Sequence, residues 1–343
     1  RVLDFLGTKA RKIKVSTFHS FCNFILRCES DALGINSDFA VYDEEDSKDI
    51  LAEIVRDYNI TVPGEDVDRF YTCLYDFIEE VKISPYKQKT VNSIDEIFFS
   101  VIRKQFFRNL DREQAFYAED IFNEYNRILA ENHVLDFTDL IVNVLTLFNT
   151  KPEILSRWQN TYDWIQVDEV QDTDIPQYLI LSALAREHRN LSFFGDIDQT
   201  IYEWRGASPY KLLELFSKDF TPVTEIKFIK NYRSTKNILS VCRAIIQEYL
   251  DAATSDLEAV SDEEGDPVIF TEQESPEDEA NWIAAKIIEL KDEIKYKNIA
   301  VLTRAHRINV PISEVFEKCG IPHFIVEQFR FFRRTEIKDA LAY

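Results

Sequence analysis

The sequence contains no methionine and only seven glycines among its 343 residues. A reading frame of this length without methionine is improbable, so we expect parts of the protein, its ends above all, to be missing from this chain. No apolar run reaches the length of a membrane-spanning helix, and no secretory signal is indicated at the N-terminus. A cytoplasmic protein is expected.

Closely spaced cysteines and an excess of basic residues are also lacking. The five cysteines never stand as CxxC, so neither a zinc site nor a disulfide framework is indicated. Lysine and arginine together number 40, against 61 aspartates and glutamates, which gives a net charge of -21. Proteins that bind nucleic acid through bulk charge are basic, so any such contact must be made in a local groove.

Hydrophobic residues make up 45% of the chain, enough for two or three domains at this length. A short β-prone run at residues 13–18 is expected to lead into a helix over 19–27. Apolar residues recur at helical spacing over 43–58 and again over 116–129. Residues 30–135 are therefore predicted to be mainly helical.

Strands and helices alternate in the second half of the chain. Predicted strands at 162–169 and 191–196 flank a predicted helix at 176–187, which implies a parallel sheet. After an acidic, loop-like stretch at 251–266, a second alternation predicts another α/β domain. Its strands are expected at 267–271, 298–303 and 323–327.

The strongest chemical signal is the pair Asp168 and Glu169 at the end of a predicted apolar strand. Nucleotide-hydrolysing α/β folds use acids in this place to hold magnesium and to position water. Taken alone, the pair is explained about equally well by solvated acids in a turn. The segment GDIDQTIYEWRGA (195–207), which follows the next strand, is far more specific because one loop combines an amide, two aromatic residues and an arginine.

Together with DEVQD (168–172), STFHSFC (16–22), NYRS (231–234) and FFRRTEIKD (331–339), this loop resembles the superfamily 1 DNA helicases of the UvrD, PcrA and Rep type. The likeness runs nearly from end to end. It implies an α/β fold with two RecA-like parallel-sheet lobes, each incomplete, and a mainly helical insertion in the first. The implied parts are a first lobe at 1–29 and 136–225, an insertion at 30–135, and a second lobe at 226–343.

For ATP and Mg²⁺, the resemblance implies a role for each acid. Asp168 would bind the metal, Glu169 would act as the base that activates the attacking water, and Gln199 would sense the γ-phosphate. These roles agree with general chemistry, because one acid can hold a metal ion while its neighbour accepts a proton.

The resemblance also implies nucleotide contacts from the second lobe. Arg233 would reach the γ-phosphate as an arginine finger, and Tyr232 would stack on adenine. Arg205 is a weaker candidate for the same cleft. An arginine that crosses between lobes stabilises the charge on the transferring phosphoryl group only when the lobes close, which couples hydrolysis to movement.

For single-stranded DNA, Thr17, Phe18 and His19 match the family's backbone- and base-contacting segment, and Tyr202 and Trp204 match its base-stacking aromatics. Stacking tolerates any base sequence. Taken alone, each aromatic residue would more often belong to a core, and His19 would more often be structural. Only their shared context favours DNA.

Two further segments leave alternatives open. The residues 331–339 place basic side chains near aromatic ones, which suits a DNA backbone, but a salt-bridged helix start fits nearly as well. The segment LDFTDL (135–140) matches the family's return from the helical insertion, and its aspartates could simply be helix caps.

One expected element is absent from the sequence. The family begins with a phosphate-binding loop of the pattern GxxxxGK followed by Ser or Thr, and none of the seven glycines stands in it. We therefore expect the full-length parent to be an enzyme and this chain alone to be inactive.

The function that the motifs favour is ATP-dependent 3′-to-5′ translocation on single-stranded DNA, with strand separation at a duplex junction, in DNA repair or replication. Repair or replication proteins are possible partners. The alternatives are the helicase subunit of a RecB- or AddA-like helicase-nuclease, and a DNA-binding scaffold without catalysis. DNA-stimulated ATPase activity in the full-length protein would exclude the scaffold.

Overall fold

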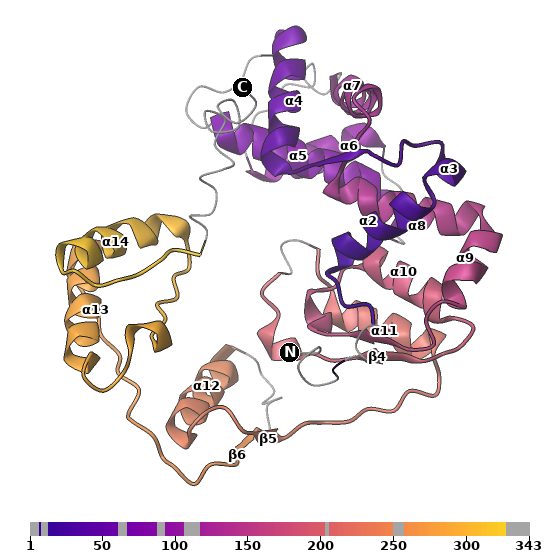
Figure 1. Cartoon of the computed structure of the whole chain (residues 1–343). Helices are drawn as coiled ribbons and strands as arrows, with labels where there is room; N and C mark the ends of the chain where they lie inside the picture. Colours follow the sequence, from indigo (N-terminus) through magenta and orange to yellow (C-terminus); the bar gives the residue numbers. More distant parts are fainter. Residues whose placement is uncertain are drawn as a thin grey trace. The chain divides into compact units, whose positions relative to one another are not determined.

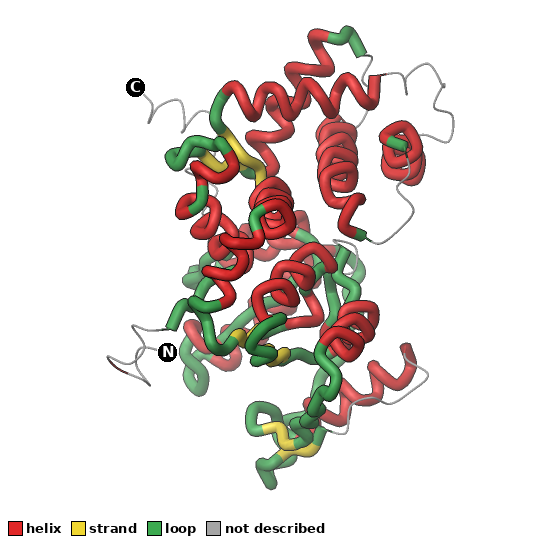
Figure 2. The backbone as a smooth tube through the Cα atoms, turned by 90° about the vertical axis from the view of Figure 1, so that its right-hand side faces the viewer, coloured by secondary structure: helices red, strands yellow, loops and turns green. Residues whose placement is uncertain are grey.

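The computed structural model describes residue 7 and residues 13–60, 67–87, 93–105, 117–202, 206–249 and 257–326. The chain divides into two compact units, Arg1–Lys227 and Phe228–Tyr343. Helices dominate the described residues and the strands are short, as Figure 2 shows.

The first unit begins with helices and ends with alternating strands and helices (Figure 1). Its described α-helices are α2 (Phe18–Cys28), α3 (Ser30–Leu33), α4 (Glu44–Asp57), α5 (Val67–Ile83), α6 (Ile94–Gln105), α7 (Ala118–Glu131), α8 (Phe137–Thr150), α9 (Pro152–Gln159), α10 (Ile175–Ala185) and α11 (Pro209–Asp219). Its described strands are β1 (Ala40–Tyr42), β2 (Val134–Asp136), β3 (Ile165–Val167) and β4 (Leu191–Phe193). Its 3-10 helices include η2 (Ser84–Tyr86), η4 (Val170–Asp172) and η5 (Ile197–Gln199).

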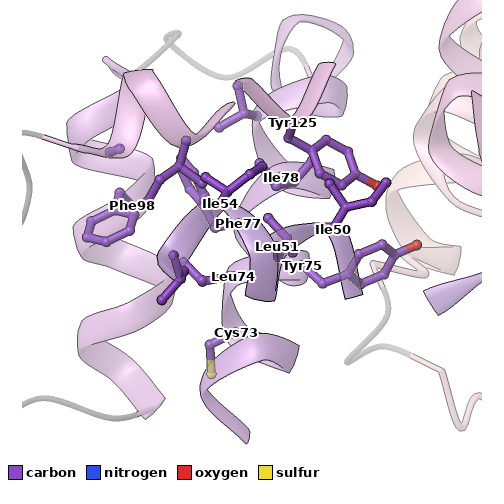
Figure 3. Packing of buried hydrophobic residues seen from close by; sticks show 14 of the residues in the cluster. Ile50, Leu51, Ile54, Cys73, Leu74, Tyr75, Phe77, Ile78, Phe98 and Tyr125 are labelled. Carbon is purple, nitrogen blue, oxygen red and sulfur yellow. The ribbon is translucent and has the colours of Figure 1, made fainter. Parts of the chain in front are cut away.

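Helices α4 to α7, which we call the helical segment, build a core of their own. Asp43 caps α4 by accepting the backbone N–H groups of Glu45 and Asp46, and Asp46 completes a capping box. The apolar faces of the four helices meet in one cluster of buried side chains (Figure 3). The helices predicted from apolar spacing are confirmed, and so is the mainly helical character of residues 30–135 wherever they are described.

The helical segment starts and ends at neighbouring strands. β1 and β2 pair in parallel, with Ala40 opposite Val134 and Tyr42 opposite Asp136. Parallel strands need a crossover of a dozen or more residues, and the helical segment supplies it here. The exact division into a first lobe and an insertion stays a prediction.

A buried ammonium group ties the helical segment to the start of α8. Lys82 Nζ on α5 lies 2.7 Å from both Asp136 Oδ2 and Asp139 Oδ1, and the Lys82 side chain is 5% exposed. The Tyr125 hydroxyl on α7 donates to the same Asp136 Oδ2 at 3.0 Å. Burial works to lower the pKa of Lys82, but the two carboxylates outweigh it and raise that pKa, so the lysine stays charged.

Asp136 also caps α8. Its Oδ1 accepts the Asp139 N–H at 2.7 Å, and Asp139 Oδ2 accepts the Asp136 N–H at 3.2 Å, which makes a capping box. The interpretation of these aspartates as helix caps is confirmed. Burial, and then the charge of Asp136, raise the pKa of Asp139 to about 6 against the opposing effect of Lys82.

Helices α2, α8, α9 and α10 surround a second core, in which Cys22, Ile25 and Leu26 of α2 are fully buried. The helix predicted over 19–27 is confirmed as α2. The strand predicted over 13–18 is wrong. Residues 13–17 are exposed and pair with no described strand, and Thr17 instead caps α2 by accepting the Ser20 N–H.

β3 and β4 pair in parallel, with Ile165 opposite Leu191 and Val167 opposite Phe193. α10 connects them and packs with α11 in a third core. The predicted alternation and the parallel pairing are confirmed, although each strand is only three residues long.

The described part of the second unit contains β5 (Lys230–Asn231), α12 (Lys236–Tyr249), β6 (Glu258–Ala259), α13 (Pro276–Leu290), η7 (Tyr296–Asn298), η8 (His306–Ile308) and α14 (Asn309–Lys318). β5 and β6 pair in parallel, so a short strand lies in the acidic stretch that was predicted to be a loop. α13 and α14 pack through a small apolar core.

The strands predicted at 267–271, 298–303 and 323–327 are wrong for the residues that are described. Phe270, Leu302 and Phe324 in these segments are 76%, 94% and 79% exposed. Their apolar composition indicated buried strands, but a strand forms only where a neighbouring strand takes its backbone hydrogen bonds.

No helix within the described ranges is long and apolar enough to cross a membrane.

Lys82→Met should lower the free energy of unfolding by about 3–5 kcal/mol, because it leaves two buried carboxylates without their cation. Urea denaturation followed by circular dichroism measures the loss. Lys211→Met is the control, because Lys211 pairs with Glu214 on an exposed surface, where such pairs contribute about 0–1 kcal/mol. A loss no larger than that of the control would contradict the role given to Lys82.

Candidate functional site

Asp168 and Glu169 follow directly after β3, and both side chains are exposed. Glu169 has a left-handed backbone with φ of 53°, which turns the chain into η4. The chain segment that follows β4 begins at the same edge of the sheet as the segment that follows β3. The Phe194 N–H donates to the Val167 carbonyl at 2.8 Å, and the Val170 N–H donates to the Phe194 carbonyl at 2.9 Å.

Side-chain hydrogen bonds connect these two strand ends through Glu169, Gln171, Asp196 and Gln199, which we call the strand-end network. Gln171 Nε2 donates to Glu169 Oε2 at 2.6 Å, and the Asp196 N–H donates to Gln171 Oε1 at 3.1 Å. Gln199 Nε2 donates to Asp196 Oδ2 at 2.8 Å. The structure therefore links two predicted site residues, Glu169 and Gln199, through two that the prediction did not single out.

Gln171 and Asp196 both stand inside motifs that the sequence made conspicuous, DEVQD and GDIDQ. Their contact joins positions 25 residues apart, and no local pattern reports such a contact. Gln171 is only 2% exposed, so its polar amide lies in the interior. A buried polar side chain needs hydrogen-bond partners. The one signal available in the sequence was therefore a glutamine inside a strand-end motif, which would need such partners if it were buried.

Gly195 allows the two strand ends to lie this close. A Cβ atom at this position would overlap Gln171 Oε1 and would lie 2.9 Å from Val170 Cγ1. The close approach, rather than an unusual backbone angle, therefore requires glycine here.

The acids at this edge are of the kind that magnesium takes as ligands. Among the described residues, no three histidine, cysteine, aspartate or glutamate side chains gather closely enough to hold a metal ion. Magnesium commonly takes one or two carboxylates together with substrate phosphates and water, so the exposed Asp168 fits that role.

Burial, and then the charge of Glu169, raise the pKa of the nearby Asp172.

The predicted DNA residues Thr17, Phe18 and His19 lie at the start of α2. Thr17 is the helix cap, and Phe18 packs partly buried against the second and third cores. The His19 ring contacts Phe137 edge to face with centroids 5.5 Å apart, and burial lowers the pKa of His19. These contacts give each residue a structural role, and their DNA contacts stay predictions.

The remaining predicted residues fall in three places. Tyr202 is partly buried, and its carbonyl accepts the Ala207 N–H at 3.3 Å. Trp204 and Arg205 lie outside the described residues, as does the whole 331–339 segment.

Tyr232 and Arg233 lie in the second unit, directly after β5. Their turn is held by Asn231, whose Oδ1 accepts the N–H groups of Arg233 and Ser234 at 2.9 and 2.8 Å. Both the Tyr232 and the Arg233 side chains are exposed, Tyr232 at 79%.

Comparison with known families decides the assignment. The model of the UvrD/REP helicase N-terminal domain matches residues 1–221, and the model of the UvrD-like helicase C-terminal domain matches residues 226–343. The chain belongs to the UvrD/REP helicase family. It is 32% identical over its whole length to the ATP-dependent DNA helicase PcrA of Staphylococcus epidermidis, and 31% identical to PcrA of Staphylococcus aureus strain Mu50. It spans 44% of the length of these relatives.

This UvrD/REP assignment confirms the resemblance seen in the motifs. The two matched regions are helicase domains of the RecA-like superfamily. Their structure combines helices with short parallel sheets. The roles of individual residues in this UvrD/REP chain stay predictions.

Gly195→Ala should lower the free energy of unfolding by about 1–3 kcal/mol, because the added methyl group overpacks the contact with Gln171 and Val170. Chemical denaturation of the folded protein measures the loss. In a Gln171→Ala background the loss should shrink, because one of the two overlaps is removed. Equal losses in both backgrounds would show that Gln171 does not set the spacing.

Proposed function

We propose that the full-length protein is an ATP-dependent DNA helicase that moves 3′ to 5′ along single-stranded DNA and separates strands at a duplex junction, in repair or replication. The support is family membership together with relatives named ATP-dependent DNA helicases. The observation that carries the proposal is the strand-end network, which hydrogen-bonds the acid Glu169 to the amide Gln199 through two residues. Because the phosphate-loop pattern does not occur in these 343 residues, we assign hydrolysis to the full-length protein.

Within this proposal, Glu169 and Asp168 have different roles. Glu169 accepts a proton from the attacking water, and Asp168 holds the magnesium ion that accompanies ATP. The bound ion offsets charge on the phosphates. Gln199 responds to the γ-phosphate from the loop after β4. Glu169 is exposed at a strand end, so water can reach it, and Gln171 holds one of its carboxylate oxygens.

Arg233 acts on the same phosphate as an arginine finger, and Tyr232 stacks on adenine. The support for both roles is that the two side chains are exposed after a turn that Asn231 holds. Neither side chain is therefore buried within its own unit. Arg205 is a weaker candidate for a phosphate contact, from the same loop as Tyr202.

Single-stranded DNA is bound by stacking rather than by bulk charge. Tyr202 and Trp204 stack on bases, and the start of α2, with Thr17, Phe18 and His19, contacts the strand. A stacked base contributes about 1–3 kcal/mol, enough to hold a strand locally on a chain with net charge -21.

Glu169→Gln in the full-length protein should slow DNA-stimulated ATP hydrolysis at least ~10²-fold and leave ATP binding nearly unchanged, because it removes the base and keeps the shape. Steady-state ATPase rates and nucleotide titration measure the two effects. Glu187→Gln, at an exposed position after α10, is the matched control. Turnover of the Glu169 variant near that of the control would refute the assignment of the base.

Tyr202→Ala should weaken single-stranded DNA binding about 5- to 100-fold for every base sequence tested, since one stacking contact is lost. Fluorescence anisotropy with labelled oligonucleotides of different composition gives the affinities. Tyr210→Ala removes an exposed tyrosine of the same unit and should change affinity little. A lower melting temperature with unchanged affinity per folded molecule would instead make Tyr202 a packing residue.

A further inference from the structure

The backbone of the acidic stretch holds both sides of the turn that carries Arg233, which lies between β5 and α12 (Figure 1). On the side before the turn, the Glu258 N–H donates to the Ile229 carbonyl at 2.7 Å. The Val260 N–H donates to the Asn231 carbonyl at 2.9 Å, and the Asn231 side chain accepts the Arg233 N–H at 2.9 Å. The pairing of β5 with β6 therefore fixes the residue that holds the turn.

The same stretch also contacts the first residues of α12, on the side after the turn. The Lys236 N–H donates to the Glu263 carbonyl at 3.4 Å, and the Asn237 N–H donates to the Glu264 carbonyl at 3.0 Å. Asn237 Nδ2 donates to the Gly265 carbonyl at 2.8 Å. Backbone N–H groups at the start of a helix have no partner within the helix, so these carbonyls satisfy donors that α12 leaves free.

Gly265 packs its backbone directly against Thr235, which stands two residues after Arg233. Its φ is 75°, in the left-handed region, and a Cβ atom at this position would lie 2.5 Å from Thr235 Cβ. Only glycine meets both requirements. We propose that Gly265 is a positioning residue, which sets through Thr235 where the turn of Arg233 lies. This inference rests on the proposed role of Arg233 as an arginine finger.

The contact between Gly265 and Thr235 is one of shape. Thr235 Oγ1 is buried and has no hydrogen-bond partner among the described residues, so hydrogen bonding does not explain the threonine here. An added methyl group on Gly265 would overlap Thr235 Cβ, and rotation of the Thr235 side chain does not move that atom. The backbone of one of the two segments must therefore shift to make room.

A shift of this kind matters because the Arg233 side chain is exposed, so its place depends on the backbone of its turn. A group that stabilises a reacting phosphoryl must be placed closely, and an error of about 1 Å can cost about 10²-fold in rate. The side chains of Glu258, Glu263 and Glu264 are exposed as well. The acidic stretch therefore serves this role through its backbone, and not through its charge.

Gly265→Ala in the full-length protein should lower the DNA-stimulated kcat about 10- to 100-fold, with KM for ATP changed less than about 2-fold, because the turn of Arg233 is displaced. Steady-state ATPase rates at saturating DNA measure both constants. Gly320→Ala is the matched control in the same unit. Gly320 is also left-handed, with φ of 67°, but no atom lies within 4 Å of a Cβ placed there. It carries the backbone strain without the contact, so its kcat should stay near that of the wild type.

The same change in an Arg233→Ala background separates positioning from a general loss of structure. If Gly265 acts only through Arg233, Gly265→Ala should lower kcat less than about 2-fold further in that background. A merely structural role of Gly265 would lower kcat by the same factor whether or not Arg233 is present.

Asn237→Asp covers the case in which Gly265→Ala does not fold. A negative charge near the start of a helix is favourable, so α12 is kept. An ionised carboxylate cannot donate, so the hydrogen bond to the Gly265 carbonyl is lost. The kcat should fall about 3- to 10-fold, as expected for one hydrogen bond, and only where Arg233 is present. In that case, an unchanged kcat for Asn237→Asp would overturn the proposal.

The outcomes separate this inference from the proposed function. Equal losses in both Arg233 backgrounds, or a loss for Gly320→Ala as large as that for Gly265→Ala, would overturn the role of Gly265 and leave the proposed function intact. Wild-type turnover by Arg233→Ala would refute the arginine finger, and the role of Gly265 with it. A wild-type protein without DNA-stimulated hydrolysis would overturn the proposed function itself.

Discussion

The parallel pairing of β3 and β4 is the constraint on which the candidate site depends. Each strand is only three residues long, yet the pairing brings chain segments 25 residues apart to one edge. Backbone hydrogen bonds continue the pairing past both strands, through Val170 and Phe194. Without this register, the acids after β3 and the amide after β4 would have no fixed separation, and the buried Gln171 would lose one of its two partners.

A second constraint acts on the helical segment. Lys82 shares its charge between two carboxylates, one of which also caps α8 and accepts the Tyr125 hydroxyl. Removing one partner of a buried ion pair is strongly destabilising, because it leaves the other charge without its counterion. The ion group therefore ties α5, α7 and α8 together at one point, while the apolar clusters fill the surrounding cores.

Sequence patterns predicted what is local. Apolar spacing located α2, α4 and α7, and the acids after β3 were found from the end of an apolar run. Contacts between distant positions could not be predicted from local patterns. Nothing in the sequence near Lys82 indicates a contact with Asp136, which lies 54 residues away. The strands predicted at 267–271, 298–303 and 323–327 failed for a related reason, because apolar residues such as Phe270 and Leu302 show β propensity but not whether a neighbouring strand is present to accept the hydrogen bonds.

The pairing of β1 with β2 limits which segments could replace the helical segment in evolution or by engineering. Its entry and exit lie side by side, so a foreign module could be grafted between Tyr42 and Val134 without redirecting the chain. The strands run parallel, however, and no tight turn can join them. Any replacement must therefore cross over the strands, so the shortest viable graft is about a dozen residues rather than a two-residue turn.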